Sequence, residues 1–143
     1  MPKPFLTQLK RSAKKLGIVT GRNRHEAYMA LKRFKINHLF DAVHTLDDTP
    51  PGKKKPHPYG LLQIAKKFGN DLCYLYIGDL PDDILAAVRA SKKLNIQGCG
   101  FTAAALNPKH MRRQLFLSGA SCVCSNAKQL QKIILPKYYP RNP

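Results

Sequence analysis

The alternation of short apolar runs with amphipathic stretches is the feature that most limits the folds open to this chain. The runs lie at 16–19, 41–45, 73–77, 96–101 and 121–124. Helical spacing of apolar residues marks 5–15, 23–34, 59–68, 80–93, 108–117 and 126–135. This order predicts βα units in a parallel sheet, so the expected fold class is α/β, a Rossmann-like three-layer α/β/α arrangement.

Local details sharpen this prediction. Asn23 is the expected N-cap of its helix, and the run 73–77 is apolar enough to be covered on both faces. The apolar positions expected to face inward are Ala27, Met29, Ala30 and Leu31 in one helix and Ile84, Leu85, Ala87 and Val88 in another. We expect one domain over 1–135 and a tail over 136–143, because 143 residues with 43% hydrophobic content suit a single core.

Cysteine usage and apolar run lengths indicate the compartment. Cys73, Cys99, Cys122 and Cys124 lie in or beside apolar runs, where cysteine behaves as a small hydrophobe, so we predict neither a disulfide nor a metal-thiolate centre. The sequence contains no run near the roughly 18 apolar residues that a membrane span requires. The expected location is the cytoplasm, without membrane association.

The charge is strongly positive, with 25 lysines and arginines against 8 acidic residues and a formal net charge of +17. Such a field attracts polyanions. Most basic residues fall on predicted polar helix faces, so a solvated surface is the favoured interpretation. A nucleic-acid partner is a less favoured one, because no aromatic-basic binding motif accompanies the charge.

Polar residues follow three of the predicted strands, and ligands of doubly wound sheets bind at the carboxyl ends of the strands. The first set is Thr20-Gly21-Arg22, where a hydroxyl and a glycine lead into a helix whose N-terminus favours an anion. Taken alone this set is weak evidence, because a Thr-Gly turn ends many strands.

The second set is Lys55-Pro56-His57-Pro58, in which two prolines stiffen the backbone beside a lysine that precedes a helix. A fixed ammonium there could neutralise phosphate charge. The alternative, and in isolation the favoured one, is an ordinary solvated lysine run.

The third set is Gly78-Asp79 with Asp82 and Asp83, which brings carboxylates to the tip of an apolar strand. Mg²⁺ prefers carboxylates and waters, so Asp79 and Asp83 make a plausible metal site. The alternative is that Asp82 and Asp83 only favour the positive end of the following helix.

Together, Val19-Thr20-Gly21-Arg22, Lys55-Pro56 and Gly78-Asp79 with Asp83 resemble the second, third and fourth motifs of the haloacid dehalogenase superfamily, in its phosphatase-like members with a small helical cap. The resemblance covers about 5–135. It implies that Thr20, Gly21, Arg22 and Lys55 bind phosphate, with Thr20 and Lys55 acting on the transferring group, and that Asp79 and Asp83 hold Mg²⁺. The implied activity is hydrolysis of phosphorylated small molecules through an aspartyl-phosphate.

The first motif of that family, Asp-x-Asp-x-Thr after a central strand, is absent from this sequence. We therefore expect an incomplete sheet with two unpaired inner edges. We also expect the chain to be a fragment, a truncated product or one half of a split protein, whose complementing N-terminal chain would supply the nucleophile. The hypotheses left open are a phosphatase inactive alone, a non-catalytic phosphate- or nucleic-acid-binding module, and an inert remnant.

Overall fold

A computed structural model describes residues 3–13 and 15–135. The predicted tail, 136–143, lies outside these residues. The helices are α1 (Lys3–Ser12), α2 (Arg24–Arg33), α3 (Tyr59–Phe68), α4 (Pro81–Ala90), α5 (Pro108–Leu117) and α6 (Ala127–Ile134), with 3₁₀ turns η1 (Asn37–Leu39) and η2 (Leu46–Asp48). The strands are β1 (Gly17–Val19), β2 (Ala42–His44), β3 (Tyr74–Gly78), β4 (Ile96–Phe101) and β5 (Cys122–Cys124).

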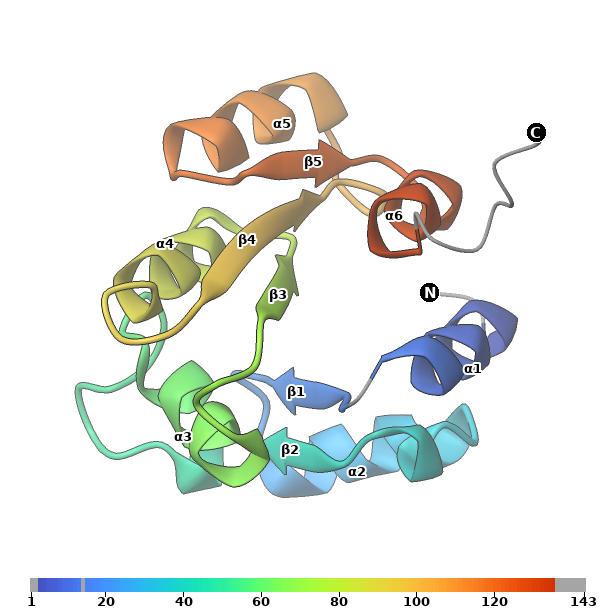
Figure 1. The fold of residues 1–143 in the computed structure, drawn as a ribbon, viewed down its shortest axis with the longest axis vertical. Helices are drawn as coiled ribbons and strands as arrows, with labels where there is room; N and C mark the ends of the chain where they lie inside the picture. Colours follow the sequence, from blue (N-terminus) through green and yellow to red (C-terminus); the bar gives the residue numbers. More distant parts are fainter. Residues whose placement is uncertain (1–2, 14, 136–143) are drawn as a thin grey trace.

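The strands form two separate parallel sheets in the described part of the chain. β1 pairs with β2, and β3, β4 and β5 pair in that order, so β1 and β3 each have one strand partner and one open edge. Figure 1 shows the two sheets lying apart, β1 and β2 in blue and cyan and β3 to β5 in green to orange. This confirms the predicted α/β class and its incomplete sheet.

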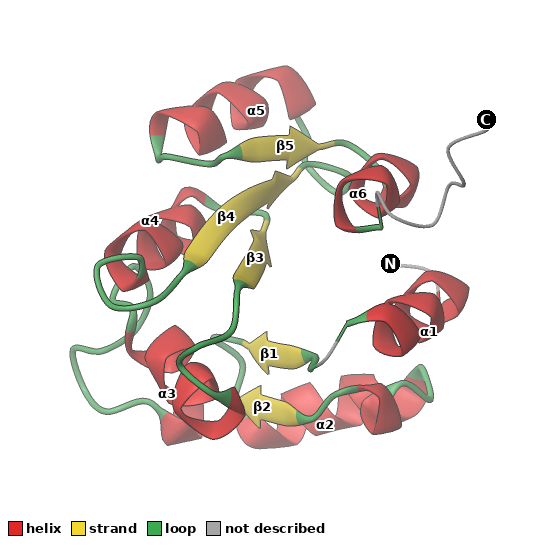
Figure 2. Cartoon of the chain, in the orientation of Figure 1, coloured by secondary structure: helices red, strands yellow, loops and turns green. Residues whose placement is uncertain are grey.

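Helices cover both faces of the strands, as a three-layer fold requires (Figure 2). On one face α3 and α4 pack around Leu61, Ala65 and Ala87, and strand side chains such as Tyr76 join them. On the other face α1 and α6 pack against the buried thiols of Cys99 and Cys124. A third apolar cluster, Ile84, Leu115 and Val123, joins α4 to α5 and β5.

Helix α1 connects the two halves. Its buried Phe5 and Leu9 belong to the cluster built on β4, β5 and α6, although the chain leads from α1 directly into β1 of the other sheet. The Gln131 side-chain amide also donates to Gln8 Oε1 over 2.8 Å, joining α6 to α1. The first helix therefore packs on the sheet that the chain builds last.

Most predicted boundaries agree with the structure to within two or three residues. Asn23 caps α2, because its side chain accepts a hydrogen bond from the Glu26 backbone N–H. Two inward assignments are wrong: Met29 is 57% exposed and Val88 is 40% exposed. Helical spacing locates an apolar stripe, but how far a neighbouring element covers that stripe is a property of the tertiary fold.

The described helices are short. Within 3–13 and 15–135, none has the length and apolar character needed to cross a bilayer.

Candidate functional site

The end of β1, where the sequence predicts an anion site, is a turn with exposed Gly21 and Arg22 whose Thr20 and Arg22 backbone N–H groups are already paired. The Thr20 N–H donates to the His44 carbonyl over 2.9 Å, which extends the β1–β2 ladder by one residue. The Thr20 hydroxyl accepts from the Arg22 N–H over 3.1 Å, while Gly21 and Arg22 are exposed. A Cβ at Gly21 would meet nothing within 4 Å, so a ligand has room to approach this turn.

Lys55 reaches the end of β3. Its ammonium lies 2.5 Å from Asp83 Oδ1 and 3.4 Å from the Tyr76 hydroxyl, and the peptide bond that follows it, Lys55–Pro56, is cis. The Lys55 side chain is 25% exposed and that of Asp83 is 6% exposed. The lysine is thus held as a fixed, partly buried charge and differs from the exposed Lys53 and Lys54 beside it.

The segment after Lys55 lies against the other sheet. Gly60, in the first turn of α3, sits so close to β1 and β2 that an added Cβ would be 2.6 Å from Val19 Cγ1 and 3.0 Å from the His44 ring. Residues 55–60 therefore span from the end of β3 to the ends of β1 and β2. They bring the Lys55 end of the site toward the Thr20 end.

Asp83 organises the turn that follows β3. Its Oδ1 accepts from Lys55 and from the Tyr76 hydroxyl (3.2 Å), and its Oδ2 accepts from the backbone N–H groups of Asp79 (3.2 Å) and Leu80 (3.1 Å). These four donors fill the roughly four acceptor positions of a carboxylate. Burial and the neighbouring Asp83 charge raise the pKa of Tyr76 far above its ordinary value, so Tyr76 stays a neutral donor.

Gly78 makes this arrangement possible. A Cβ at that position would lie 2.2 Å from Asp83 Cβ, a separation far shorter than any real contact between two such atoms. Only glycine lets the first turn of α4 pack this closely on the end of β3.

Asp79 is the accessible carboxylate at this turn. Its side chain is exposed, whereas its backbone N–H is bound by Asp83. In the described part of the chain, no group of three or more His, Cys, Asp or Glu residues could hold a metal ion. Mg²⁺ is commonly held by one or two carboxylates together with waters and substrate phosphates, and Asp79 fits such a partial set of ligands. Asp83 could join it only by giving up one of its four donors.

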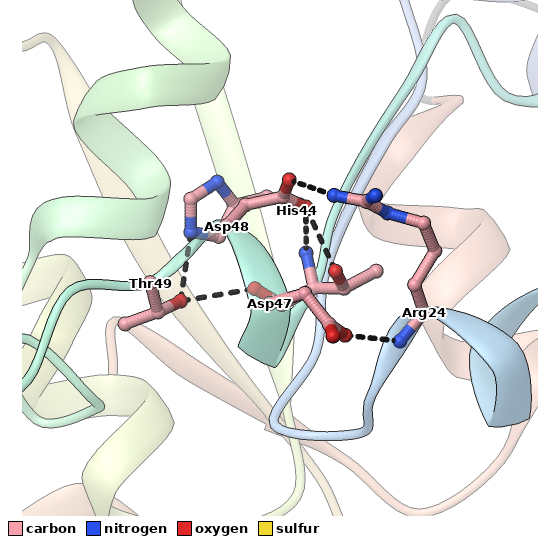
Figure 3. Close-up of polar contacts among 6 residues, drawn as sticks. Arg24, His44, Asp47, Asp48 and Thr49 are labelled. Atoms are coloured by element: carbon pink, nitrogen blue, oxygen red, sulfur yellow. Dashed lines mark hydrogen bonds and ion pairs between the residues drawn. The ribbon is translucent and has the colours of Figure 1, made fainter.

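A second polar cluster, which the sequence predictions missed, holds the neighbouring loop in place (Figure 3). Arg24 at the start of α2 donates from its guanidinium to Asp48 over 2.7 Å and from its backbone N–H to Asp47 over 2.5 Å. Asp48 also accepts from the backbone N–H and hydroxyl of Thr45, over 2.9 and 2.8 Å. The pKa of Asp48 falls to about 2, and the hydrogen bond from the Thr45 backbone N–H contributes most to this decrease.

This cluster supports the Thr20 turn. The Leu46 N–H donates to the Arg22 carbonyl over 2.9 Å, and the imidazole of buried His44 lies 3.0 Å from the Thr49 hydroxyl. Burial lowers the pKa of His44. The pattern Thr45-x-x-Asp48 is a helix-start signal that could have located η2, but local spacing could not have revealed the partner 24 residues earlier.

The predicted site residues are brought together in part. Lys55, Asp83 and the Asp79 backbone meet at the end of β3, and Thr20 with Gly21 and Arg22 forms a turn at the end of β1. In the described part of the chain, no hydrogen bond joins the two groups. The space between β1 and β3 separates them, and residues 55–60 connect them.

These features define a class of protein: a parallel α/β fold with an exposed Thr-Gly turn at the end of one strand and a lysine–aspartate pair at the end of another. The haloacid dehalogenase-like hydrolase model matches residues 3–96. The chain belongs to this family of hydrolases.

Similar proteins of known sequence include a pyrophosphatase and a dehydratase. The chain is 40% identical over 81 residues to the pyrophosphatase PpaX of Anoxybacillus flavithermus, covering 55% of this chain and 36% of that protein. It is 36% identical over 91 residues to the imidazoleglycerol-phosphate dehydratase of Phytophthora nicotianae, covering 62% of this chain and 20% of that protein. The matches thus span between a fifth and two fifths of these relatives.

Solved structures share the fold. A haloacid dehalogenase-like protein of unknown function from Agrobacterium tumefaciens superimposes with a TM-score of 0.77 at 23% identity, covering 92% of this chain and 58% of that one. A HAD-superfamily hydrolase of subfamily IA from Geobacter sulfurreducens gives 0.68 at 23% identity, covering 92% of this chain and 53% of that one. The chain therefore spans little more than half of these structures.

Proposed function

We propose that this chain provides the phosphate- and magnesium-binding part of a phosphomonoester hydrolase. The observation that carries the proposal is the pair Lys55 and Asp83, which lie 28 residues apart in sequence and 2.5 Å apart in space at the end of β3. A lysine held in this way is a fixed cation at a strand end, where a phosphate would bind. Family membership supports the hydrolase class.

The site residues have separate roles in this proposal. Thr20, Gly21 and Arg22 offer a hydroxyl, the Gly21 backbone N–H and a guanidinium to the phosphate, and Lys55 neutralises its charge. Asp79 and Asp83 would hold Mg²⁺, which supplies charge neutralisation at the phosphoryl oxygens. Asp79 offers the accessible oxygens, whereas Asp83 would have to exchange one of its present donors.

The nucleophile has to come from elsewhere. An aspartyl-phosphate requires an aspartate aligned with the phosphorus, and the Asp-x-Asp-x-Thr motif that provides it in this family is absent from the sequence. We propose that the chain alone binds phosphate without hydrolysing its esters, and that a complementing segment supplies the missing carboxylates.

Binding of inorganic phosphate, measured by calorimetry with and without Mg²⁺, tests the site. Lys55→Met should weaken binding at least tenfold, and Asp79→Asn should remove the effect of Mg²⁺. The matched control is Lys54→Met, which changes the same net charge at an exposed neighbour and should alter the affinity less than twofold. Equal effects of the two lysine changes would show that only the general positive field attracts phosphate.

Hydrolysis of p-nitrophenyl phosphate by the pure chain tests the missing nucleophile. We expect no Mg²⁺-dependent turnover. Turnover by the chain alone that Asp79→Asn abolishes would mean that the chain carries a complete site.

A second candidate is a non-catalytic polyanion-binding module, which the net charge of +17 favours. Binding to DNA or RNA that weakens steeply with salt would support it. If nucleic acid binds equally well to Lys55→Met and Lys54→Met, this binding is separate from the phosphate site.

A further inference from the structure

The acidic residues are confined to one part of the sequence. The last of the eight is Asp83, whereas ten of the 25 lysines and arginines follow it. Every lysine and arginine in the described residues beyond Asp83 is exposed: Arg89, Lys92, Lys93, Lys109, Arg112, Arg113, Lys128 and Lys132. The end of α4, together with β4, α5, β5 and α6, therefore carries positive charge only.

Helix α5 is the outermost element of this part of the fold. Figure 1 shows it in orange at one end of the longest axis, with β5 on its inner side. The inner side of α5 buries Leu115, which packs with Ile84 of α4 and Val123 of β5. Lys109, Arg113 and Leu117 follow one another at intervals of four residues, so they form one stripe along the helix, and all three are exposed.

Apolar side chains are exposed at both ends of α5. Leu106, which precedes the cap of the helix, is fully exposed, and Leu117, its last residue, is 72% exposed. Phe116 is exposed beside Leu117, and the Arg112 guanidinium lies 5.0 Å from the centroid of its ring. We name the following set the α5 face: Leu106, Lys109, Arg113, Phe116 and Leu117.

Charge distinguishes the α5 face from α2, the other helix that exposes large apolar side chains beside basic ones. α2 exposes Met29 and Phe34 close to the basic residues of its last turn. However, α2 also carries Glu26, and its first residue, Arg24, is bound by two carboxylates of η2. Neither α5 nor the end of α4 that packs against it contains an acidic residue beyond Asp83.

We propose that the α5 face binds the surface of an anionic lipid bilayer. Leu106, Phe116 and Leu117 would enter the boundary of the acyl chains, while Lys109 and Arg113 lie among the headgroup phosphates. A helix with basic and protruding apolar side chains lies flat in this interface. The expectation of no membrane association rests on the lack of a spanning run, which such a helix does not require.

Two other partners fit the α5 face less well. The phosphates of a nucleic acid would bind the basic residues but leave Leu106 and Leu117 in water. A second copy of the chain would place one acid-free face against another, and like charges repel. A bilayer accommodates both kinds of side chain, because its headgroups are anionic and its acyl chains begin just below them.

Sedimentation with vesicles tests the charge requirement. The probes are vesicles of phosphatidylcholine alone and of phosphatidylcholine with about one third phosphatidylserine. The chain should bind the anionic vesicles at least about tenfold more tightly, and added salt should weaken this binding. Lys109→Gln combined with Arg113→Gln should weaken it at least about tenfold, because each basic residue near an anionic surface raises the affinity about fivefold. The matched control, Lys32→Gln combined with Arg33→Gln in α2, removes the same charge and should change the affinity about twofold at most.

Fluorescence tests whether the apolar side chains enter the bilayer. The chain contains no tryptophan, so Leu117→Trp introduces a single reporter at an exposed position. Lipids brominated in their acyl chains should quench this reporter, whereas they should not quench Phe34→Trp in α2. Leu106→Ser combined with Leu117→Ser should weaken vesicle binding at least about tenfold, and Met29→Ser combined with Phe34→Ser is the matched control.

Several results would overturn the inference. They are the failure to bind anionic vesicles, equal binding to both kinds of vesicle, equal effects of the α5 and α2 variants, and a Leu117→Trp reporter that bound vesicles leave unquenched. Tighter binding to RNA than to vesicles, weakened by the charge variant of α5 but not by its leucine variant, would make nucleic acid the partner. Release from vesicles by inorganic phosphate at constant ionic strength would place the lipid phosphate at Lys55 instead. The proposed phosphate site has its own test, because none of the substituted residues belongs to it.

Discussion

Replacing Asp83 by alanine should destabilise the protein more than any other change at the site. The substitution removes the acceptor of four hydrogen bonds and leaves the Lys55 ammonium and the Tyr76 hydroxyl without their partner. It also removes the carboxylate that caps α4 through the Asp79 and Leu80 N–H groups.

The magnitude follows from these losses. Losing a helix cap costs about 1 kcal/mol. Leaving the Lys55 ammonium and the Tyr76 hydroxyl without a partner costs about 1 kcal/mol for each group. This is the low end of the usual range, because Lys55 is 25% exposed and water can reach its ammonium. The expected loss in the free energy of unfolding is about 3 kcal/mol. Asp83→Asn keeps an acceptor for the cap and should lose about half of that.

Urea unfolding followed by far-UV circular dichroism measures the difference. The matched control is Asp82→Ala, one residue earlier, whose exposed side chain accepts no hydrogen bond among the described residues and whose loss should cost less than about 0.5 kcal/mol. If Asp83→Ala and Asp82→Ala unfold at the same urea concentration, the Lys55–Asp83 pair contributes nothing to the fold, and the geometry behind the proposed site is wrong.

Three further predictions concern the surrounding structure. Gly78→Ala should lower the free energy of unfolding by at least about 2 kcal/mol, because its Cβ would lie 2.2 Å from Asp83 Cβ. Gly21→Ala meets open space and should lower it by less than about 1 kcal/mol. Urea midpoints of the two variants measure the difference, and equal midpoints would contradict the close packing at Gly78. Asp48, with a folded pKa near 2 against an ordinary 3.8, should contribute stability above pH 4 that is lost as the pH falls toward 2. After discounting for its 33% exposure, that contribution is about 1 kcal/mol and should disappear in Asp48→Asn, as acid titrations of unfolding would show. Burial depresses the pKa of His44, so protonation should favour unfolding as the pH falls below about 6.5, and an NMR titration that places its pKa above that value would refute this.

The sequence predicted the elements well, because each strand and helix carries its own periodic pattern. The helix bounds 59–68 and 108–117 and the strand 96–101 agree with α3, α5 and β4 to the residue. The incomplete sheet was also predictable. When a central strand is missing and the rest of the sheet folds normally, each of the two neighbouring strands is left with one unpaired edge.

What the sequence could not provide is contact between distant residues. Arg24 and Asp48 meet across 24 positions, and Asp83 collects donors from four different residues. No local spacing encodes such pairs. The role of Asp83 in fixing Lys55 and the turn therefore appears only in the structure.

The position of α1 has a consequence for synthesis on the ribosome. Phe5 and Leu9 are synthesised well before their partners on β4, β5 and α6, and the contact between Gln8 and Gln131 spans 123 positions. Contacts this remote in sequence slow folding, because a long loop must close before they form. The apolar face of α1 must therefore stay without these partners until β4, β5 and α6 have emerged, and this interval is when a chaperone would be needed most.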